Sequence, residues 1–305
     1  MNVIEVSHLH KRYGNKVAVA DISFAVADGE IFGMVGPNGA GKTTTIECVE
    51  GLRPPDKGQI RVLGLDPQKD GYALREQIGV QLQESALPER LKVGEAMELF
   101  AAFYKQKADW RALLERLGLT EKVNTPFAKL SGGQKQRLFI ALALINMPKL
   151  VFLDELTTGL DPQSRRNTWD LVREIREQGR TVFLTTHYME EAEQLCDRVA
   201  IVDQGRIVAL DAPENLVRSL GVEQRVVFRV NGRFDPTPFY NIPGVTRVEA
   251  TNGDGKVVVY GRDNEFLTHL LQAMISQGIQ YQELHTEKPS LEDVFLNLTG
   301  RQIRN

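Results

Sequence analysis

The stretch GPNGAGKT, residues Gly36 to Thr43, decides the fold of this 305-residue chain. Its glycines let the backbone curl so that successive N–H groups point inward at an anion. The apolar run DGEIFGMVG leads directly into the loop, which predicts a buried strand before it, and a helix is expected from Thr43. A glycine-rich loop between a strand and a helix binds phosphate groups. We assign this role to Gly36, Pro37, Asn38, Gly39, Ala40, Gly41, Lys42, Thr43 and Thr44.

Four side chains in and beyond this loop have a predicted chemical role. Lys42 reaches the β- and γ-phosphates of a nucleotide, and the hydroxyl of Thr43 is a ligand for Mg²⁺. The run KLVFLDEL ends in two acids, Asp154 and Glu155, at the end of a strand where parallel sheets place ligands. We predict that Asp154 holds the Mg²⁺ shell and that Glu155 orients or deprotonates the attacking water.

Further candidates lie at the ends of other segments. His187 ends the predicted strand TVFLTTH in the same topological position, where a hydrogen-bond donor stabilises charge on the γ-phosphoryl group. Gln81 and Gln83 close the strand IGVQLQ and share a face, so either amide can reach the metal or its water; a polar strand edge is the alternative. Tyr13 can stack on a purine or be an ordinary turn aromatic.

A second anion-binding pattern lies at LSGGQKQR, residues Leu130 to Arg137. Its serine and two glycines precede a long apolar run, as at the start of a helix. Free backbone N–H groups and the helix dipole favour an anion there. The chain therefore carries two phosphate-binding patterns, which raises the question of which nucleotide the second one contacts.

Composition indicates a globular chain with more than one domain. The length and the hydrophobic content of 42% suffice for a large core. A formal net charge of -3 gives no overall attraction to nucleic acid or acidic lipid. Because no apolar stretch reaches the roughly 20 residues of a membrane span, we expect a cytoplasmic protein or one bound to a membrane through a partner. Cys48 and Cys196 have no metal-binding or disulfide spacing and are expected to be buried thiols.

The order of the patterns predicts two domains. Strands alternate with helices over residues 1–218, which implies a parallel, helix-covered sheet, and helical spacing over about 84–147 predicts an inserted helical lobe. From about Gly221 the character changes to antiparallel strands and two helices. Residues 219–305 are therefore predicted to form a small α+β domain, from the segments QRVVFRV, VTRVEAT, KVVVYG, NEFLTHLLQAMISQG and SLEDVFLNLTG.

These motifs in this order resemble the nucleotide-binding subunits of ATP-binding-cassette (ABC) transporters over residues 1–218, and LSGGQ is the most specific marker of that family. The resemblance implies an α/β P-loop NTPase cassette with a parallel core sheet, N-terminal antiparallel strands and an inserted helical subdomain. The small C-terminal α+β domain follows it here. ATP and Mg²⁺ are the implied cofactors, and hydrolysis of ATP is the implied reaction.

The resemblance also implies roles for single residues. In the family two cassettes pack head to tail, and each signature helix caps the ATP held by the other subunit. The resemblance favours Gln83 over Gln81 as the metal- and partner-sensing glutamine, and Tyr13 as the adenine-stacking aromatic. GLDP places Asp161 in the loop that links the paired sites, and His187 matches the switch histidine. The residues expected to contact the partner's ATP are Ser131, Gly132, Gly133 and Gln134.

A subfamily resemblance extends these expectations. The segment TTHYMEEAEQLCDRVAIVDQGRIVALDAPENL and the ending PSLEDVFLNLTG are similar to the daunorubicin-resistance-like exporters, in which a separate ATPase chain works beside a membrane permease. We expect a subunit at the cytoplasmic face of the cell membrane, held by the permease and paired with a second copy of itself, with export as its direction. Leu156 stands where a proline often follows the catalytic glutamate, so the loop is expected to differ there while the carboxylate is retained.

Two alternatives stay open from the sequence alone. A soluble cassette ATPase that acts on nucleic acid or protein assemblies generally has tandem cassettes, long coiled coils or basic surfaces, none of which this sequence shows. No nucleic-acid partner is therefore expected. A binding module that uses ATP without hydrolysing it is disfavoured by the complete pair of acids, Asp154 and Glu155, and by His187.

Overall fold

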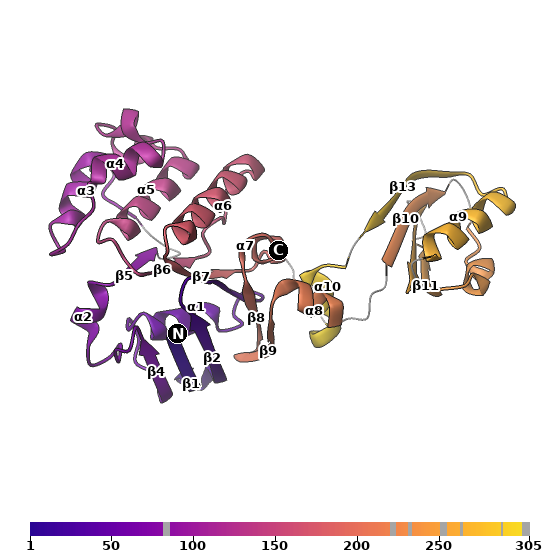
Figure 1. Ribbon diagram of the computed structural model, residues 1–305, viewed down its shortest axis with the longest axis horizontal. Helices are drawn as coiled ribbons and strands as arrows, with labels where there is room; N and C mark the ends of the chain where they lie inside the picture. Colours follow the sequence, from indigo (N-terminus) through magenta and orange to yellow (C-terminus); the bar gives the residue numbers. More distant parts are fainter. Residues whose placement is uncertain are drawn as a thin grey trace. The chain divides into compact units, whose positions relative to one another are not determined.

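The computed structural model describes residues 1–81, 86–219, 224–230, 234–250, 255–262, 265–287 and 289–300. The chain divides into two compact units, Met1–Pro213 and Glu214–Gln302 (Figure 1). The division lies at the start of α8 (Pro213–Ser219), whereas the sequence places the domain boundary near the end of this helix. Among the described residues, no helix is both long and apolar enough to cross a membrane.

A parallel sheet forms the centre of the first unit. Its strands read as nearly unbroken apolar runs because helices cover both faces, so that side chains on both sides are buried. Strand β3 pairs in parallel with β7 and β8, and β6 pairs in parallel with β7 and β5. The bounds are β3 (Ile31–Val35), β5 (Ile78–Gln81), β6 (Leu150–Asp154), β7 (Thr181–Thr186) and β8 (Arg198–Asp203).

Antiparallel strands extend this sheet at one side. Strand β1 (Asn2–Tyr13) pairs with β2 (Lys16–Ala27) and β4 (Lys57–Val62), and β9 (Arg206–Asp211) pairs with β8. Over the described residues the sheet has nine strands in the order β4-β1-β2-β9-β8-β3-β7-β6-β5. Helix α1 (Lys42–Val49) contacts β1, β2 and β4 as well as β6 and β7, so it lies between the antiparallel and parallel parts. The predicted cassette fold is confirmed, but β2, β8 and β9 were not predicted as separate strands.

The described part of the predicted lobe is helical. Its main helices are α3 (Val93–Ala101), α4 (Trp110–Arg116) and α5 (Gly132–Leu144), which gather at one end of the first unit in Figure 1. The short helix α2 (Gly71–Arg75) precedes β5. Helices α6 (Pro162–Glu177) and α7 (Met189–Leu195) follow β6 and β7, pack against each other and contact β7. They therefore stand beside the strand ends that carry the candidate catalytic groups.

Both cysteines are buried free thiols, as the sequence predicts. Burial raises the pKa of Cys48 to about 11, and it also raises the pKa of Cys196 well above the usual value. Gly33 in β3 passes close to the second thiol, because a Cβ built on it would lie 2.6 Å from the Sγ of Cys196. A side chain at this strand position would collide with the residue that follows α7.

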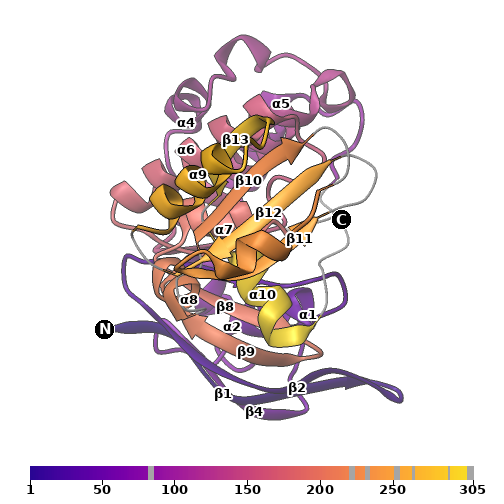
Figure 2. The ribbon, with the colours of Figure 1, turned by 90° about the vertical axis from the view of Figure 1, so that its right-hand side faces the viewer.

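The second unit is a split βαβ arrangement. Its four strands, counted over the described residues, are all antiparallel and have the order β11-β12-β10-β13, with a 3-10 helix in place of the first crossover helix. Figure 2 shows α9 lying across the sheet, where Phe266, Leu270 and Met274 join the strand residues Val226 and Phe228 in one core. The elements are β10 (Gln224–Val230), η3 (Thr237–Asn241), β11 (Val245–Ala250), β12 (Lys256–Gly261), α9 (Phe266–Ser276), β13 (Tyr281–Glu287) and α10 (Leu291–Thr299).

Four phenylalanines connect β2, β3, β6 and β7 within the core of the first unit. The ring of Phe183 lies 5.4 Å from Phe32 and 5.8 Å from both Phe24 and Phe152, measured between centroids. We expect Phe183→Ala to lower the free energy of unfolding by about 3–5 kcal/mol, because it leaves a cavity at the centre of this cluster. Urea denaturation measures the loss. Phe103, which is 67% exposed, is the control, and an equal loss for Phe103→Ala would contradict the account.

Candidate nucleotide site

The phosphate loop connects β3 to α1, as the sequence predicts. Two of its glycines are required by close contacts with neighbouring backbone. Gly36 has φ 156°, and a Cβ on it would lie 2.1 Å from the carbonyl oxygen of Val202. Gly41 has φ 107°, and a Cβ there would lie 2.5 Å from the carbonyl oxygen of Ala18. No other residue can take the conformation of these two positions without moving β2 or β8.

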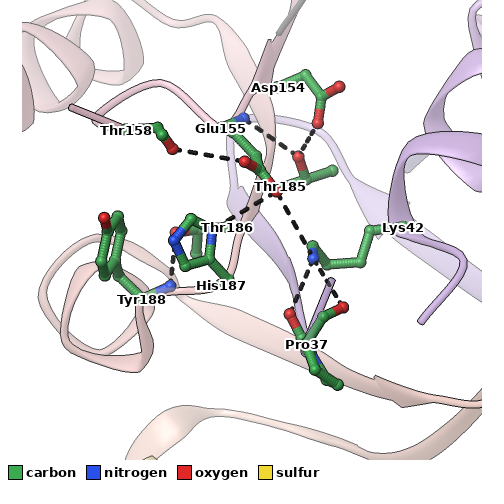
Figure 3. A network of polar contacts seen from close by, with 10 residues as sticks. Pro37, Lys42, Asp154, Glu155, Thr158, Thr185, Thr186, His187 and Tyr188 are labelled. Atoms are coloured by element: carbon green, nitrogen blue, oxygen red, sulfur yellow. Dashed lines mark hydrogen bonds and ion pairs between the residues drawn. The ribbon is translucent and has the colours of Figure 1, made fainter. Parts of the chain in front are cut away.

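Lys42 begins α1 and presents a buried ammonium to the strand ends of the sheet. Its Nζ donates hydrogen bonds to the carbonyl oxygens of Gly36 at 2.8 Å and Pro37 at 3.2 Å, and it lies 3.8 Å from Oε1 of Glu155 (Figure 3). Burial lowers the pKa of Lys42, whereas the charges of Glu155 and Asp154 act to raise it. The cation thus stands between the loop and the two acids.

Asp154 is the last residue of β6 and is 2% exposed. It accepts a short hydrogen bond from the hydroxyl of Thr185 on the neighbouring strand β7 (Figure 3). Burial raises the pKa of Asp154, and the bond from Thr185 opposes this shift. The carboxylate is therefore oriented by a strand neighbour and faces the same region as Lys42.

Glu155 leaves the strand in a left-handed conformation with φ 48°. Its N–H donates to the carbonyl oxygen of Thr185 at 3.0 Å, and the hydroxyl of Thr158 donates to its Oε2 at 3.4 Å. The following Leu156 is 2% exposed, so its side chain is part of the core. Burial in the core is a physical reason for a leucine at this position, where the sequence predicts a changed loop geometry. The carboxylate of Glu155 still lies beside Lys42.

His187 follows β7. It approaches Oε1 of Glu155 on one side, and Lys42 approaches the same oxygen on the other. The Nδ1 of His187 lies 3.5 Å from Oε1 of Glu155, and its side chain is only 12% exposed (Figure 3). The ring of Tyr188 lies 4.1 Å away between centroids and limits how the histidine can rotate. The structure therefore brings together Lys42, Asp154, Glu155 and His187 from the loop and two strand ends.

A cavity of about 310 Å³ opens beside the phosphate loop. Tyr13 at the end of β1 lies on its wall and is 41% exposed, with the guanidinium of Arg53 5.5 Å from the ring centroid. An accessible aromatic face at the rim of a phosphate-binding cavity fits a stacking role toward a purine. The lining residues are Tyr13, Lys16, Ala18, Asn38, Gly39, Gly41, Lys42, Thr43, Thr44 and Glu155.

The LSGGQ segment forms an exposed helix start. Ser131 caps α5: its hydroxyl accepts from the N–H of Gln134 at 3.3 Å, and the Gln134 side chain accepts from the N–H of Ser131 at 3.0 Å. A Cβ on Gly133 would lie 3.2 Å from Oγ of Ser164, whose N–H and hydroxyl both donate to Asp161, the cap of α6. The structure thus brings the signature segment to Asp161, and within the described residues neither lines the cavity of the phosphate loop.

Gln83, the predicted metal- and partner-sensing glutamine, lies outside the described residues. Gln81 ends β5 and is buried, with 4% of its surface exposed. The choice between the two amides therefore stays a prediction from the resemblance.

The donor set of the site fits Mg²⁺. Thr43 lines the cavity and Asp154 ends the adjoining strand, so a hydroxyl and a carboxylate offer the oxygen ligands that this hard cation prefers. Mg²⁺ usually takes one or two protein ligands and completes its shell with phosphates and water. The described part of the chain holds no cluster of three or more His, Cys, Asp or Glu side chains suited to a metal ion.

Sequence reasoning missed Glu50, at the end of α1. It is 3% exposed, and neither carboxylate oxygen has a hydrogen-bond partner among the described residues. Burial raises its pKa to about 9, and the nearby Asp154 and Glu47 add to the shift. The signal in the sequence is an acid inside the apolar pattern IECVEGL.

Comparisons with known proteins identify the family. The chain is 39% identical over 304 residues to the daunorubicin resistance ATP-binding protein DrrA3 of Streptomyces coeruleorubidus, covering 97% of this chain and 96% of that protein. It is 36% identical over 311 residues to the linearmycin resistance ATP-binding protein LnrL of Bacillus subtilis, covering 99% and 100%. The chain belongs to the family of ABC transporter ATP-binding proteins. It is an ABC ATPase, which couples hydrolysis of ATP to transport.

Family models match both domains of this ABC ATPase. The family model for ABC transporters matches residues 19–158, and the model for the C-terminal domain of DrrA1-3-like ATP-binding proteins matches residues 222–299. A solved structure described as the ATP-binding subunit of an ABC transporter has a TM-score of 0.65 and 29% identity, covering 72% of this chain and 93% of that one. The Nod factor export ATP-binding protein I of Rhizobium etli is 38% identical over 311 residues, covering 99% and 95%.

Glu50 makes the stability of the protein dependent on pH. The folded carboxyl keeps its proton up to about pH 9, whereas the unfolded one releases it above its ordinary pKa of 4.5, so stability falls as pH rises through this window. We expect Glu50→Gln to raise the free energy of unfolding by on the order of 1–3 kcal/mol near pH 8 and to change little near pH 4. Denaturation at both pH values measures this. The exposed Glu98→Gln is the control, and a gain independent of pH would contradict the assignment.

Proposed function

We propose that two copies of this ABC ATPase close head to tail around two ATP molecules with Mg²⁺, and that closing and reopening drive export through a separate membrane permease. The observation that carries the proposal is the separation of two phosphate-binding patterns. The phosphate loop and Glu155 line one cavity, whereas Ser131 caps an exposed helix start beside Asp161. An uncovered helix N-terminus has free N–H groups for an anion, and a second copy can supply one.

Each residue of the site has a defined part in this proposal. The N–H groups of the phosphate loop and Lys42 bind the β- and γ-phosphates, and Thr43 with Asp154 holds Mg²⁺. Bound Mg²⁺ neutralises charge that develops on the phosphate oxygens. Glu155 orients the attacking water and accepts its proton, since its carboxylate points at the same region as the Lys42 ammonium.

The remaining candidates surround this centre. His187 stands 3.5 Å from Glu155 and donates a hydrogen bond toward the γ-phosphoryl oxygen as charge builds up there. Tyr13 stacks on the adenine at the rim of the cavity. From the partner copy, Ser131 and the following glycines contact the γ-phosphate, and Asp161 links the two sites. Gln83 keeps its proposed role as the glutamine that senses the metal and the partner.

The permease partner and the membrane location are proposed from the relatives. Proteins similar over nearly the full chain are named for export or for drug resistance, and no helix among the described residues is suited to cross a membrane. We therefore place this subunit at the cytoplasmic face of the cell membrane, bound to a permease. The relatives differ in cargo, so no cargo is proposed.

The direct test is Glu155→Gln. We expect ATP turnover to fall by at least about a hundredfold, because the amide cannot accept the proton of water, while ATP binding and ATP-dependent dimerisation persist. Phosphate release and size-exclusion chromatography with ATP measure the two properties. Glu177→Gln, at an exposed position of α6, is the control and should behave as wild type. Wild-type turnover in Glu155→Gln would overturn the role of Glu155, and loss of ATP-dependent dimerisation would overturn the closed dimer.

A further inference from the structure

A buried carboxylate on α7 lies among the segments that carry the proposed catalytic groups. Glu191 is 1% exposed, and its Oε1 accepts a hydrogen bond of 3.1 Å from the indole Nε1 of Trp169 on α6. Burial raises the pKa of Glu191, whereas the nearby side chains of Thr186, Thr157 and Trp169 act in the opposite direction. The hydrogen bond from Trp169 offsets part of the cost of burying this carboxyl group.

The neighbours of Glu191 belong to three different parts of the site. Thr186 ends β7 and directly precedes His187, and Thr157 belongs to the loop that carries Glu155. Trp169 is on α6, whose N-terminus is capped by Asp161. One side chain therefore stands between the histidine segment, the glutamate segment and the helix of the linking loop.

A second contact ties the same segments together. The guanidinium of Arg165 on α6 lies 4.5 Å from the ring centroid of Tyr188, whose ring in turn lies 4.1 Å from that of His187. The N–H of Tyr188 donates to the hydroxyl of Thr186 at 3.0 Å. Helix α6 thus holds the histidine segment at two points, through a cation–π contact and through Trp169 with Glu191.

An ordinary core role does not account for an acid at this position. The other buried residues of α7 are Met189, Ala192 and Leu195, so an apolar side chain at 191 would match its neighbours without the cost of desolvating a carboxylate. The charge of Arg165 acts to lower the pKa of Glu191 against the larger effect of burial, and the indole N–H of Trp169 donates to its Oε1. What the acid adds over an apolar residue is a directed hydrogen bond to α6.

We propose that Glu191 is a positioning residue: by tying α7, which begins directly after Tyr188, to α6, it fixes the segment Thr186–Tyr188, holds His187 within reach of Glu155 and makes the position of His187 depend on the Asp161 loop. The expected effect on turnover rests on the proposed function of His187. The effect on the placement of the His187 ring does not, because it follows from the contacts of Glu191, Trp169 and Arg165 alone.

The test uses the full chain with Glu191→Leu, Glu191→Gln and Trp169→Phe, and Glu190→Gln as a matched control. Glu190 is exposed on the same first turn of α7. We expect Glu191→Leu to lower kcat at least about tenfold with KM for ATP changed less than about twofold, and Trp169→Phe to lower kcat about threefold. Glu191→Gln keeps an acceptor for the indole and should restore part of the loss. A protein with both Glu191→Leu and Trp169→Phe should be no slower than Glu191→Leu alone, because both changes break one contact.

A second readout follows the histidine itself. In nuclear magnetic resonance spectra of histidine-labelled protein, assigned with His187→Ala, the His187 ring signals should move in Glu191→Leu and Trp169→Phe and stay in place in Glu190→Gln. Unmoved His187 signals in these variants would overturn the proposal, whether kcat falls or stays at the wild-type value. If Glu191→Leu does not unfold cooperatively, Trp169→Phe and Glu191→Gln decide by the same criteria.

The two proposals fail in distinguishable ways. Wild-type turnover in His187→Ala would overturn the proposed role of His187 in hydrolysis, whatever the Glu191 variants do. Moved His187 signals in Glu191→Leu would still support the positioning contact in that case. Unmoved signals together with an inactive His187→Ala variant would leave the proposed function intact and overturn the role of Glu191.

Discussion

The buried ammonium of Lys42 is the interaction on which the site of the first unit depends. It bonds to two carbonyl oxygens of its own loop and lies 3.8 Å from Glu155, so it joins the β3–α1 segment to the end of β6. A buried cation needs such partners, and its position requires the glycine conformations of the loop and the parallel alignment of β3, β7 and β6. The parallel sheet thus places the ends of β3, β6 and β7 side by side, where Lys42 can contact the residues that follow β3 and β6.

Burial controls the electrostatics around this cation. It lowers the pKa of Lys42 and raises those of Asp154, Glu50 and Glu191, so each of the four groups lies where water is largely excluded. Charge interactions are stronger there than at the surface, because the local dielectric constant is low. Asp154 and Glu191 are each held by a neighbouring donor, whereas Glu50 has none among the described residues. The cost of burying an acid without a partner is thus concentrated at the end of α1.

Local patterns predicted much of this structure. The phosphate loop, β1, β10 and β12 have the expected positions. Each carries a distinct local pattern, either a glycine-rich turn or a run of apolar residues, and the fold buries most of the residues that the pattern marks as apolar. Strand β2 was missed although Val19, Ile22, Phe24 and Val26 are buried along it. Strand β13, YQELHTE, carries no apolar alternation, since it is a largely exposed edge strand whose place is set by pairing with β10. The contacts of Glu191 and Glu50 depend on how helices pack, which spacing in a sequence does not encode.

The central claim is that each ATP is held by the phosphate loop of one copy and the signature helix of the other. Phosphate release by mixed Lys42→Ala and Ser131→Arg proteins tests it most directly, since each variant alone has two defective sites. In a mixed dimer one site carries both defects and the other carries none, so the mixture should regain up to roughly a quarter of wild-type turnover after subunit exchange. Recovery well above either variant alone is the predicted result. If subunits exchange, as fluorescence transfer between labelled copies would show, and turnover does not recover, the claim is contradicted.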